Sequence, residues 1–253
     1  MNFLKHPLTK DLDIDNPNTT LLRRDIILQK NFLKNIYNEW YQNICINIPD
    51  GEGEILELGS GGSFIKDISP EILTSELFWL PEFDIILDGQ QLPFADGQLK
   101  AIIMTNVLHH IPDVERFFSE AQRCLRPQGK IILLEPWVSS WSKFIYKNFH
   151  DEPFEMDAKS WKLPGKGPLS SANGALPWIL FERDQSEFYK RFSSLKIELI
   201  RGTMPFRYLL SGGVSMRALV PDFSYRFWKW IDTKASKMGN MFNMFAYIII
   251  ERN

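Results

Sequence analysis

The segment ILELGSGGSF, residues 55–64, decides the fold of this chain. It is a short apolar strand that opens directly into Gly59, Gly61 and Gly62. A strand-to-helix turn at this point brings bare backbone against a ligand, because a Cβ atom would obstruct the approach. The helix that follows presents unpaired N–H groups to a carboxylate or a hydroxyl. The segment therefore predicts a ligand site at the carboxyl end of a strand, and the alternative is a tight turn that binds nothing.

Short apolar strands alternate with helices around this turn, which predicts a parallel sheet covered on both faces. The expected elements are a helix from about 18 to 48, strands at 72–76, 84–88, 101–106 and 130–135, and a helix that starts near Pro112. Two late strands, 195–200 and about 242–252, complete seven strands, and we expect the last one to be antiparallel. Only about eight residues separate strands two and three, which is too few for an ordinary crossover helix. We expect a single helical turn there, or a shifted strand boundary.

Composition excludes several classes of protein. Hydrophobic residues make up 44% of the chain and the net charge is −2, so a large core is expected and nucleic acid is not, because duplex binders present a basic face. Cys45 and Cys124 stand apart, without a C-x-x-C pair or clustered histidines, so we expect neither a disulfide nor a metal site. The start of the chain lacks the apolar core of a signal peptide, and the longest apolar run, 245–250, is too short to span a bilayer. We therefore expect a cytoplasmic protein.

The pattern E-x-G-x-G-G at 57–62 resembles motif I of class I S-adenosylmethionine-dependent methyltransferases, and within them the broad type 11 group. A dinucleotide-binding G-x-G-x-x-G would place glycine where this chain has Phe64. The resemblance continues through DGQQLPF, which is similar to the family's D-x-x-x-L-P-F segment. It continues further through TNVLHHIPD (105–113) and RCLRPQGKIIL (123–133), so that it covers roughly 52–135.

The resemblance implies a Rossmann-like three-layer α/β sandwich that binds S-adenosylmethionine. Glu76 would accept hydrogen bonds from the two ribose hydroxyls and Asp88 from the adenine amino group, although both acids could also be solvated strand ends. His109 and His110 are candidate catalytic bases, with packing or capping as the alternative, and Asn106 could be a turn former. The residues that we expect at the cofactor are Glu57, Gly59, Ser60, Gly61, Glu76, Asp88, Gly89 and Asn106.

The parts of the chain outside the resemblance should form the acceptor site. We expect one domain with an N-terminal arm and capping helix (1–50), a cofactor-binding core (51–135), an acceptor-site insertion (136–194) and C-terminal strands and helix (195–253). Residues 137–180 together with the first helix should form the acceptor pocket and become ordered when the cofactor binds, because a long aromatic-rich loop in a compact domain is usually functional and can close over the methyl group. The candidate acceptor-site residues are Arg23, Arg24, Tyr37, Tyr41, His150, Asp151, Glu152, Trp161 and Asn173.

The predicted activity is direct transfer of a methyl group to a small molecule, with an oxygen of a sugar or another metabolite hydroxyl as the acceptor. An alcohol needs a base in the transition state, whereas an amine or a thiolate can lose its proton beforehand. The alternatives are an NAD(P)-dependent oxidoreductase and an inactive cofactor-binding module. Two aromatic stripes, Trp137–Phe149 and Phe223, Phe227, Ile231, lead us to expect core packing, with membrane contact as the alternative. The cations Arg226, Lys229, Lys234 and Lys237 accompany the second stripe.

Overall fold

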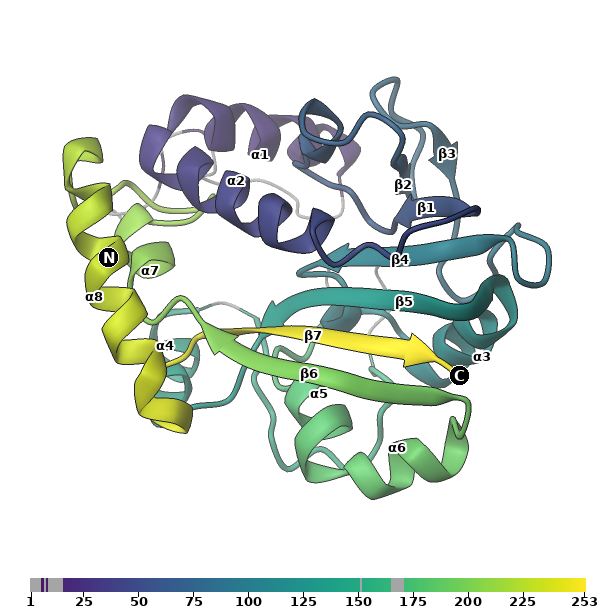
Figure 1. Cartoon of the computed structure of the whole chain (residues 1–253). Helices are drawn as coiled ribbons and strands as arrows, with labels where there is room; N and C mark the ends of the chain where they lie inside the picture. Colours follow the sequence, from purple (N-terminus) through teal and green to yellow (C-terminus); the bar gives the residue numbers. More distant parts are fainter. Residues whose placement is uncertain (1–5, 7, 9–15, 151, 165–170) are drawn as a thin grey trace.

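Seven strands form one sheet in the computed structural model, which describes residues 6, 8, 16–150, 152–164 and 171–253. The sheet order is β3-β2-β1-β4-β5-β7-β6, and β7 runs antiparallel to both of its neighbours (Figure 1). The seven strands and the antiparallel last strand are as predicted. A doubly wound dinucleotide-binding sheet continues in parallel to its edge, so the inserted antiparallel strand argues against the oxidoreductase alternative. The strands are β1 Glu54–Glu57, β2 Leu73–Glu76, β3 Ile85–Ile86, β4 Leu99–Thr105, β5 Leu125–Pro136, β6 Leu195–Thr203 and β7 Phe245–Arg252.

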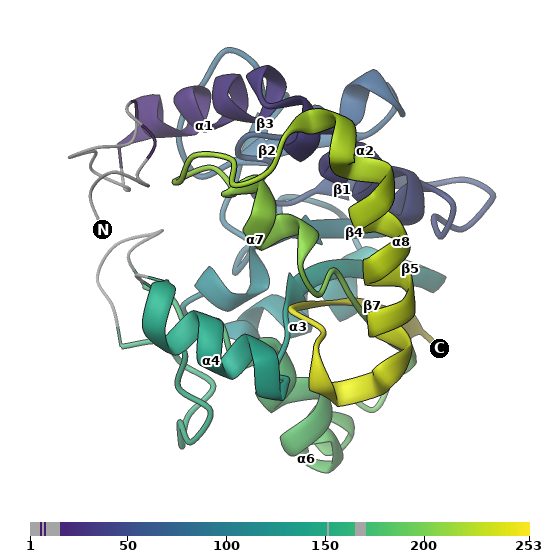
Figure 2. The same cartoon turned by 90° about the vertical axis from the view of Figure 1, so that its left-hand side faces the viewer.

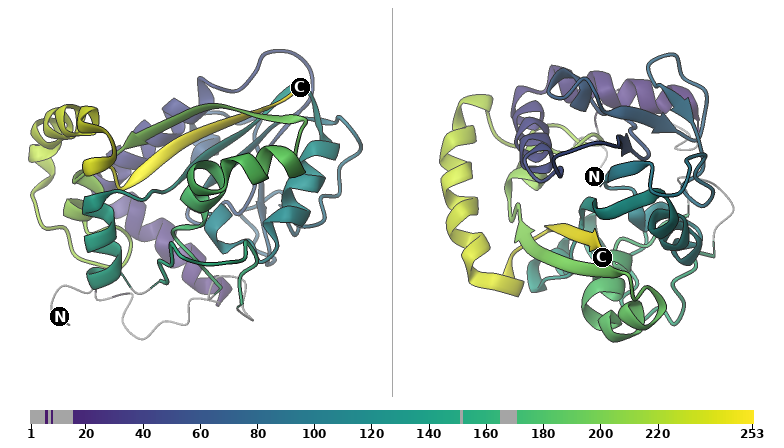
Figure 3. Two further views of the ribbon diagram at one scale, coloured as in Figure 1. Left: turned by 90° about the horizontal axis from the view of Figure 1, so that it is seen from below. Right: turned by 45° about the vertical axis from the view of Figure 1, so that its right-hand side comes forward.

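Helices cover both faces of this sheet. Figure 3 shows α3 and α6 on one face and α2 on the other, while Figure 2 shows α4, α7 and α8 at the side to which the parallel strands point. The α-helices are α1 Pro17–Gln29, α2 Asn31–Cys45, α3 Val114–Cys124, α4 Ser140–Phe149, α5 Leu176–Trp178, α6 Gln185–Arg191, α7 Arg207–Ser211 and α8 Tyr225–Ala235. The short segments of other helix types are η2 Ile65–Asp67, η3 Leu108–His110, η4 Ile179–Arg183, η5 Asp222–Ser224 and η6 Ser236–Met241.

The predicted single helix at 18–48 is wrong, because the chain breaks between α1 and α2 at Lys30. Lys30 has an extended backbone (φ −93°, ψ 92°), and its ammonium donates to the carbonyls of Gly213 and Met216 at 2.6 and 2.9 Å. The break therefore depends on a segment that is remote in sequence. No helix forms between β2 and β3 either, since Asp84 Oδ2 accepts hydrogen bonds from both Thr74 N and Thr74 Oγ1 at 2.8 Å and closes this connection as a loop.

The core is continuous from the sheet into the helices that flank it. Helix α3 turns one face into this core, since Val114, Phe117, Phe118 and Ala121, which recur at helical spacing, are fully buried. Phe118 lies edge-on to Phe188 of α6, with ring centroids 5.1 Å apart. In the part of the chain that the structure describes, no helix is long and apolar enough to cross a membrane.

Arg207 joins α2, α7 and α8 through a buried ion-pair network. Its guanidinium donates to both carboxylate oxygens of Glu39 at 2.9 and 3.0 Å, and to Asp232 Oδ2 at 2.8 Å. Burial alone would raise the pKa of Glu39, but hydrogen bonds from Arg207 and Lys229 lower it to about 2. Arg207 and Asp232 are almost completely buried, so Asp232 depends on this one cation, whereas Glu39 also pairs with Lys229 at 2.9 Å.

Replacement of Arg207 should therefore destabilise the fold strongly. We expect Arg207→Met to lower the free energy of unfolding by about 3–5 kcal/mol, because it leaves the buried carboxylate of Asp232 without its partner. Urea denaturation followed by circular dichroism measures this loss. Arg201→Met is the matched control at an exposed arginine that lies over the ring of Tyr247, and it should cost less than about 1 kcal/mol. Equal stability of the two variants would contradict the assignment.

Candidate functional site

A cavity of about 970 Å³ opens at the carboxyl ends of the parallel strands. This volume is in the range of small-molecule sites. Its walls come from α1 and α2, from the glycine turn after β1, from the loops after β2, β3 and β4, from α4, and from residues 208–216. The ends of several elements therefore surround one chamber, and residues 58–63 of the glycine-rich segment form part of its wall.

The glycine turn has the backbone that only glycine adopts without strain. Gly59 and Gly61 have φ of +62° and +55°. A Cβ on Gly59 would approach both methyl carbons of Val107 to 3.0 Å, and a Cβ on Gly62 would approach Ile27 Cδ1 of α1 to 2.9 Å. Two separate features therefore require small residues at this turn: the backbone conformation, and the close approach of α1 and of the loop after β4.

Glu57 and Ser60 support this turn from below. The carboxyl of Glu57 is 1% exposed and does not line the cavity, and its Oε1 accepts from Ser63 Oγ at 3.0 Å. Burial raises the pKa of Glu57 to about 7. Ser60 lines the cavity, but its Oγ accepts from Ser75 N at 3.1 Å and so connects β1 with β2. The structure thus places the Glu57 carboxyl under the turn, where it holds Ser63.

Glu76 lies at the cavity wall, where its carboxylate clasps the turn. Its Oε1 accepts from Gly61 N at 2.8 Å and its Oε2 from Leu77 N at 3.0 Å. Burial raises the pKa of Glu76. Because each carboxylate oxygen has two acceptor sites, both oxygens keep one for a ligand hydroxyl.

The other three predicted cofactor residues also line the cavity. Asp88 is exposed and accepts from Gln90 N at 2.8 Å. A Cβ on the neighbouring Gly89 would lie 2.7 Å from Leu58 Cδ2, so a larger residue there would have to displace the Leu58 side chain. Asn106 has a left-handed backbone with φ +58°, as expected for a turn former, and it also borders the cavity. The structure therefore brings together all the predicted cofactor residues except the carboxyl of Glu57.

His109 lies between two carboxylates at the inner end of the chamber. Its Nδ1 is 2.6 Å from Glu135 Oε2, and its Nε2 is 3.5 Å from Glu152 Oε2. Glu135 is fully buried and also accepts from Val107 N and Leu108 N at 2.8 Å. Burial alone would lower the pKa of His109, but the two carboxylates raise it to about 9. His109 is therefore charged at neutral pH.

His110 has the opposite electrostatics. Its ring is tilted toward that of His109 at 4.2 Å between centroids, and its Nδ1 is 3.3 Å from the Ser171 carbonyl oxygen. Burial and the charge of His109 lower the pKa of His110 to about 3. One ligand atom each from His109, His110 and Glu152 lies within 4.8 Å of the others, a group that could hold a metal ion. The expectation of no metal stays a prediction.

The candidate acceptor residues fall into two sets. Arg23, Tyr37, Tyr41, His150 and Glu152 line the cavity. Arg24, Trp161 and Asn173 do not, and Asp151 lies outside the described residues. The Trp161 indole donates to Asp184 Oδ2 at 2.9 Å, and the Asn173 amide bonds the backbone of Glu155, so both residues hold their own segment together.

Sequence reasoning missed two parts of the site. Glu135 is the last residue but one of β5, much as Glu57 and Glu76 end β1 and β2, so its place near the end of a strand was an available signal. The wall formed by residues 208–216 had no such signal, because its position depends on the contact between Lys30 and the carbonyls of Gly213 and Met216.

Residues 58–133 match the family model described as a methyltransferase domain. The chain is 25% identical over 142 residues to the ubiquinone/menaquinone biosynthesis C-methyltransferase of Rickettsia typhi, covering 46% of this chain and 56% of the relative. It is 28% identical over 114 residues to the demethylmenaquinone methyltransferase of Tropheryma whipplei, covering 38% and 47%. The chain thus spans about half the length of the curated relatives that it matches.

Solved structures agree on the fold. Geranyl diphosphate C-methyltransferase from Streptomyces coelicolor aligns with a TM-score of 0.52 at 11% identity, covering 98% of this chain and 88% of the other. At that identity the likeness concerns the fold alone. Together with the matched family model, it confirms the resemblance to the class I methyltransferases that motif I predicted.

The two adjacent histidines should titrate far apart. We expect His109 to titrate near pH 9 and His110 near pH 3, because carboxylates surround the first while burial and a neighbouring cation act on the second. Nuclear magnetic resonance of histidine-labelled protein measures both values, since the chain has four histidines. His109→Gln and His110→Gln variants assign the signals.

Protein stability should follow the same charges. The folded pKa of His109 lies above the unfolded value of 6.5, so its contribution is complete below pH 6.5 and is lost as the pH rises through 9. Each unit of pKa difference between the folded and the unfolded state is equivalent to about 1.4 kcal/mol in the free energy of unfolding. A His109→Gln variant with the same decline in stability between pH 6.5 and 9 would contradict this assignment.

Proposed function

We propose that the chain transfers a methyl group from S-adenosylmethionine to a hydroxyl-bearing small molecule, since residues 58–133 match the model of a methyltransferase domain. The observation that carries the proposal is the imidazole of His109, held by the buried carboxylate of Glu135 at the inner end of the cavity. An alcohol is the acceptor class that needs a base in the transition state.

The residues at the glycine turn suit S-adenosylmethionine. Gly59 and Gly61 leave a cradle that a Cβ would fill, and Glu76 offers two acceptors at its wall for a vicinal diol. Asp88 borders the same chamber with a carboxylate that suits an amino group. When bound, S-adenosylmethionine supplies an electrophilic methyl group. These residues bind and orient it, and the rest of the chamber excludes water.

The His109–Glu135 pair would remove the acceptor proton. With His109 neutral, Nδ1–H donates to Glu135 and the lone pair of Nε2 is free to accept the hydroxyl proton. Glu135 then stabilises the imidazolium, as its 2.6 Å contact and three hydrogen-bond donors favour. Glu152, 3.5 Å from Nε2, is a positioning residue that would accept a hydrogen bond from the acceptor.

Transfer to oxygen is the first candidate and transfer to carbon the second. The similarity to a C-methyltransferase of ubiquinone and menaquinone biosynthesis favours carbon. The same base serves both outcomes, because loss of a phenolic proton also activates the ring carbon beside the hydroxyl. Mass spectrometry and carbon NMR of the product from labelled methyl donor separate them, since an O-methyl and a C-methyl carbon resonate in different regions.

Cofactor binding should depend on Glu76. We expect Glu76→Ala to weaken binding of S-adenosylhomocysteine by about one to two powers of ten, since charge-assisted hydrogen bonds contribute about 1.5–3 kcal/mol each. Isothermal titration calorimetry measures the change. Glu82→Ala removes an exposed carboxylate from the loop after β2 and should leave the affinity unchanged. Identical affinity in both variants would remove Glu76 from the cofactor site.

Turnover should depend on His109 and Glu135. We expect His109→Gln to lower methyl transfer about 10²–10⁴-fold because the base is lost, and Glu135→Gln to lower it because the imidazole loses the carboxylate that orients it. Both variants should still bind S-adenosylhomocysteine. The wild-type rate should rise with pH through about 9, where Nε2 loses its proton. In Glu135→Gln the rise should move to lower pH. Transfer of label from S-adenosylmethionine to a panel of phenols and sugar alcohols provides the assay.

The same assay tests the metal alternative. If Nε2 of His109 held a metal ion, it could not also accept a proton. Activity that a chelator removes and a divalent cation restores would therefore assign His109, His110 and Glu152 to a metal site and overturn the base.

A further inference from the structure

The outward face of α8 and its flanking turns carries a row of exposed large apolar side chains. Phe223, Phe227 and Trp230 are 88%, 57% and 61% exposed, and Met238 and Met241 of η6 continue the row. Their spacing of three or four residues places Phe223, Phe227 and Trp230 on one side of a helix. The expectation that Phe223 and Phe227 pack into the core is therefore wrong. The reason is that the other side of α8 is already occupied by Asp232, bound to Arg207, and by Tyr225.

Cations outnumber acids beside this row. Arg226, Lys229, Lys234 and Lys237 are exposed alongside it, and Lys229 also pairs with Glu39 at 2.9 Å. The two acids of the same segment are engaged elsewhere: Asp232 is buried against Arg207, and Asp222 Oδ1 accepts from Phe32 N at 3.1 Å. The surface is thus both aromatic and basic, although the whole chain has a net charge of −2.

The exposed row continues onto α4. Phe144 and Phe149 are 52% and 43% exposed, and their rings lie edge to face at 5.8 Å. Helix α4 packs against η6, and Figure 2 shows α4 and α8 on the same side of the molecule. Phe149 and its neighbour Lys147 also line the cavity. The rim of the cavity therefore belongs to the same surface.

We propose that this aromatic face, formed by α8, η6 and α4, docks on an anionic lipid bilayer. Phenylalanine, tryptophan and methionine in a row with lysine and arginine beside it is the pattern of helices that lie in the membrane interface. The aromatic rings enter the boundary between headgroups and acyl chains, while the cations contact lipid phosphates. Exposed apolar patches of this kind mark contact surfaces, and here the charge around the patch selects an anionic one.

Docking in this orientation puts the rim of the cavity at the level of the lipid headgroups. Phe149 and Lys147 belong to both surfaces, so an acceptor with an apolar tail would reach the cavity from the bilayer. That last step rests on the proposed function. The docking itself does not, because it needs neither cofactor nor acceptor.

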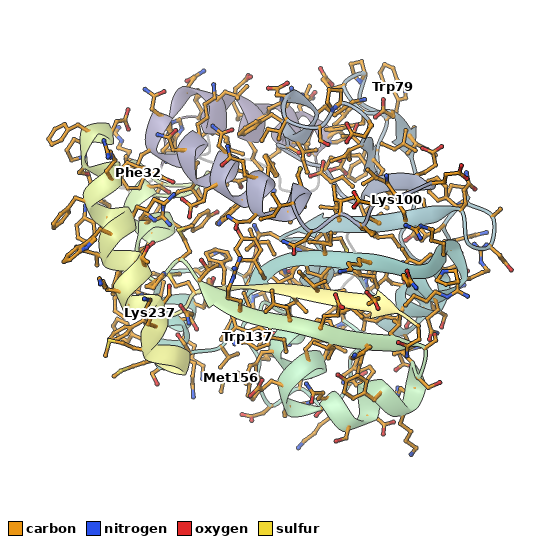
Figure 4. The ribbon with its side chains drawn as sticks, in the orientation of Figure 1. Phe32, Trp79, Lys100, Trp137, Met156 and Lys237 are labelled. Carbon is orange, nitrogen blue, oxygen red and sulfur yellow. The ribbon has the colours of Figure 1, made fainter. Side chains whose placement is uncertain are left out.

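Sedimentation with vesicles of phosphatidylcholine, with and without phosphatidylglycerol, tests the proposal on the full chain. We expect binding to the mixed vesicles that weakens with salt. Trp230→Ser should reduce the affinity for the vesicles about tenfold or more, because it removes an indole ring that the bilayer would bury. Its control is Trp79→Ser, a 73% exposed tryptophan at the far end of the molecule from Lys237 (Figure 4).

A charge-matched pair of variants tests the cations. Arg226→Gln/Lys234→Gln/Lys237→Gln should weaken binding about a hundredfold, at about fivefold for each cation near an anionic surface. Lys100→Gln/Lys190→Gln/Lys196→Gln changes the net charge by the same amount on other elements, and vesicle binding of this variant should differ little from that of the wild type. Retained S-adenosylhomocysteine binding, or an unchanged circular dichroism spectrum, shows that each variant is folded.

Three results would overturn the proposal. The first is no binding to either kind of vesicle, and the second is equal loss in the aromatic-face variants and their controls. The third is a wild-type dimer in light scattering that Trp230→Ser converts to a monomer without any lipid binding, which would assign the face to a second copy of the chain.

Discussion

The carboxylate of Glu135 fixes the position of the loop after β4 relative to the end of β5. It accepts hydrogen bonds from the backbone of Val107 and Leu108 and contacts the ring of His109, so the loop after β4 is fastened to the end of β5. The methyl groups of Val107 in turn press against the position where Gly59 would carry a Cβ. One buried acid thus fixes both the space above the glycine turn and the orientation of the imidazole.

The carboxylate of Glu135 can be buried only because neighbouring groups donate hydrogen bonds to it and compensate its charge. Two N–H groups and a charged imidazole surround Glu135, and Glu152 lies on the other side of the same ring. The cation between two anions explains why His109 is charged while His110, one residue on, is neutral. Two adjacent histidines therefore differ in charge, because only His109 lies against the carboxylate near the end of β5.

The sequence was sufficient for the parts of the fold that depend on local pattern. Strand positions, the antiparallel last strand, the buried stripe of α3 and the need for glycine at Gly59 follow from periodicity and backbone sterics. The break at Lys30 did not, because a contact to Gly213 creates it. The outward face of α8 did not either, since aromatic residues lie on both of its sides and the pairing of Asp232 with Arg207 decides which side is buried.

The bond between Lys30 and the carbonyls of Gly213 and Met216 joins segments 183 and 186 residues apart. The N-terminal helices and the wall of the cavity at 208–216 are therefore one mechanical piece. Any change that moves this wall would leave the Lys30 ammonium without its acceptors unless the α1–α2 junction moved with it. The shape of that side of the cavity is thus set by two segments that lie far apart in the sequence.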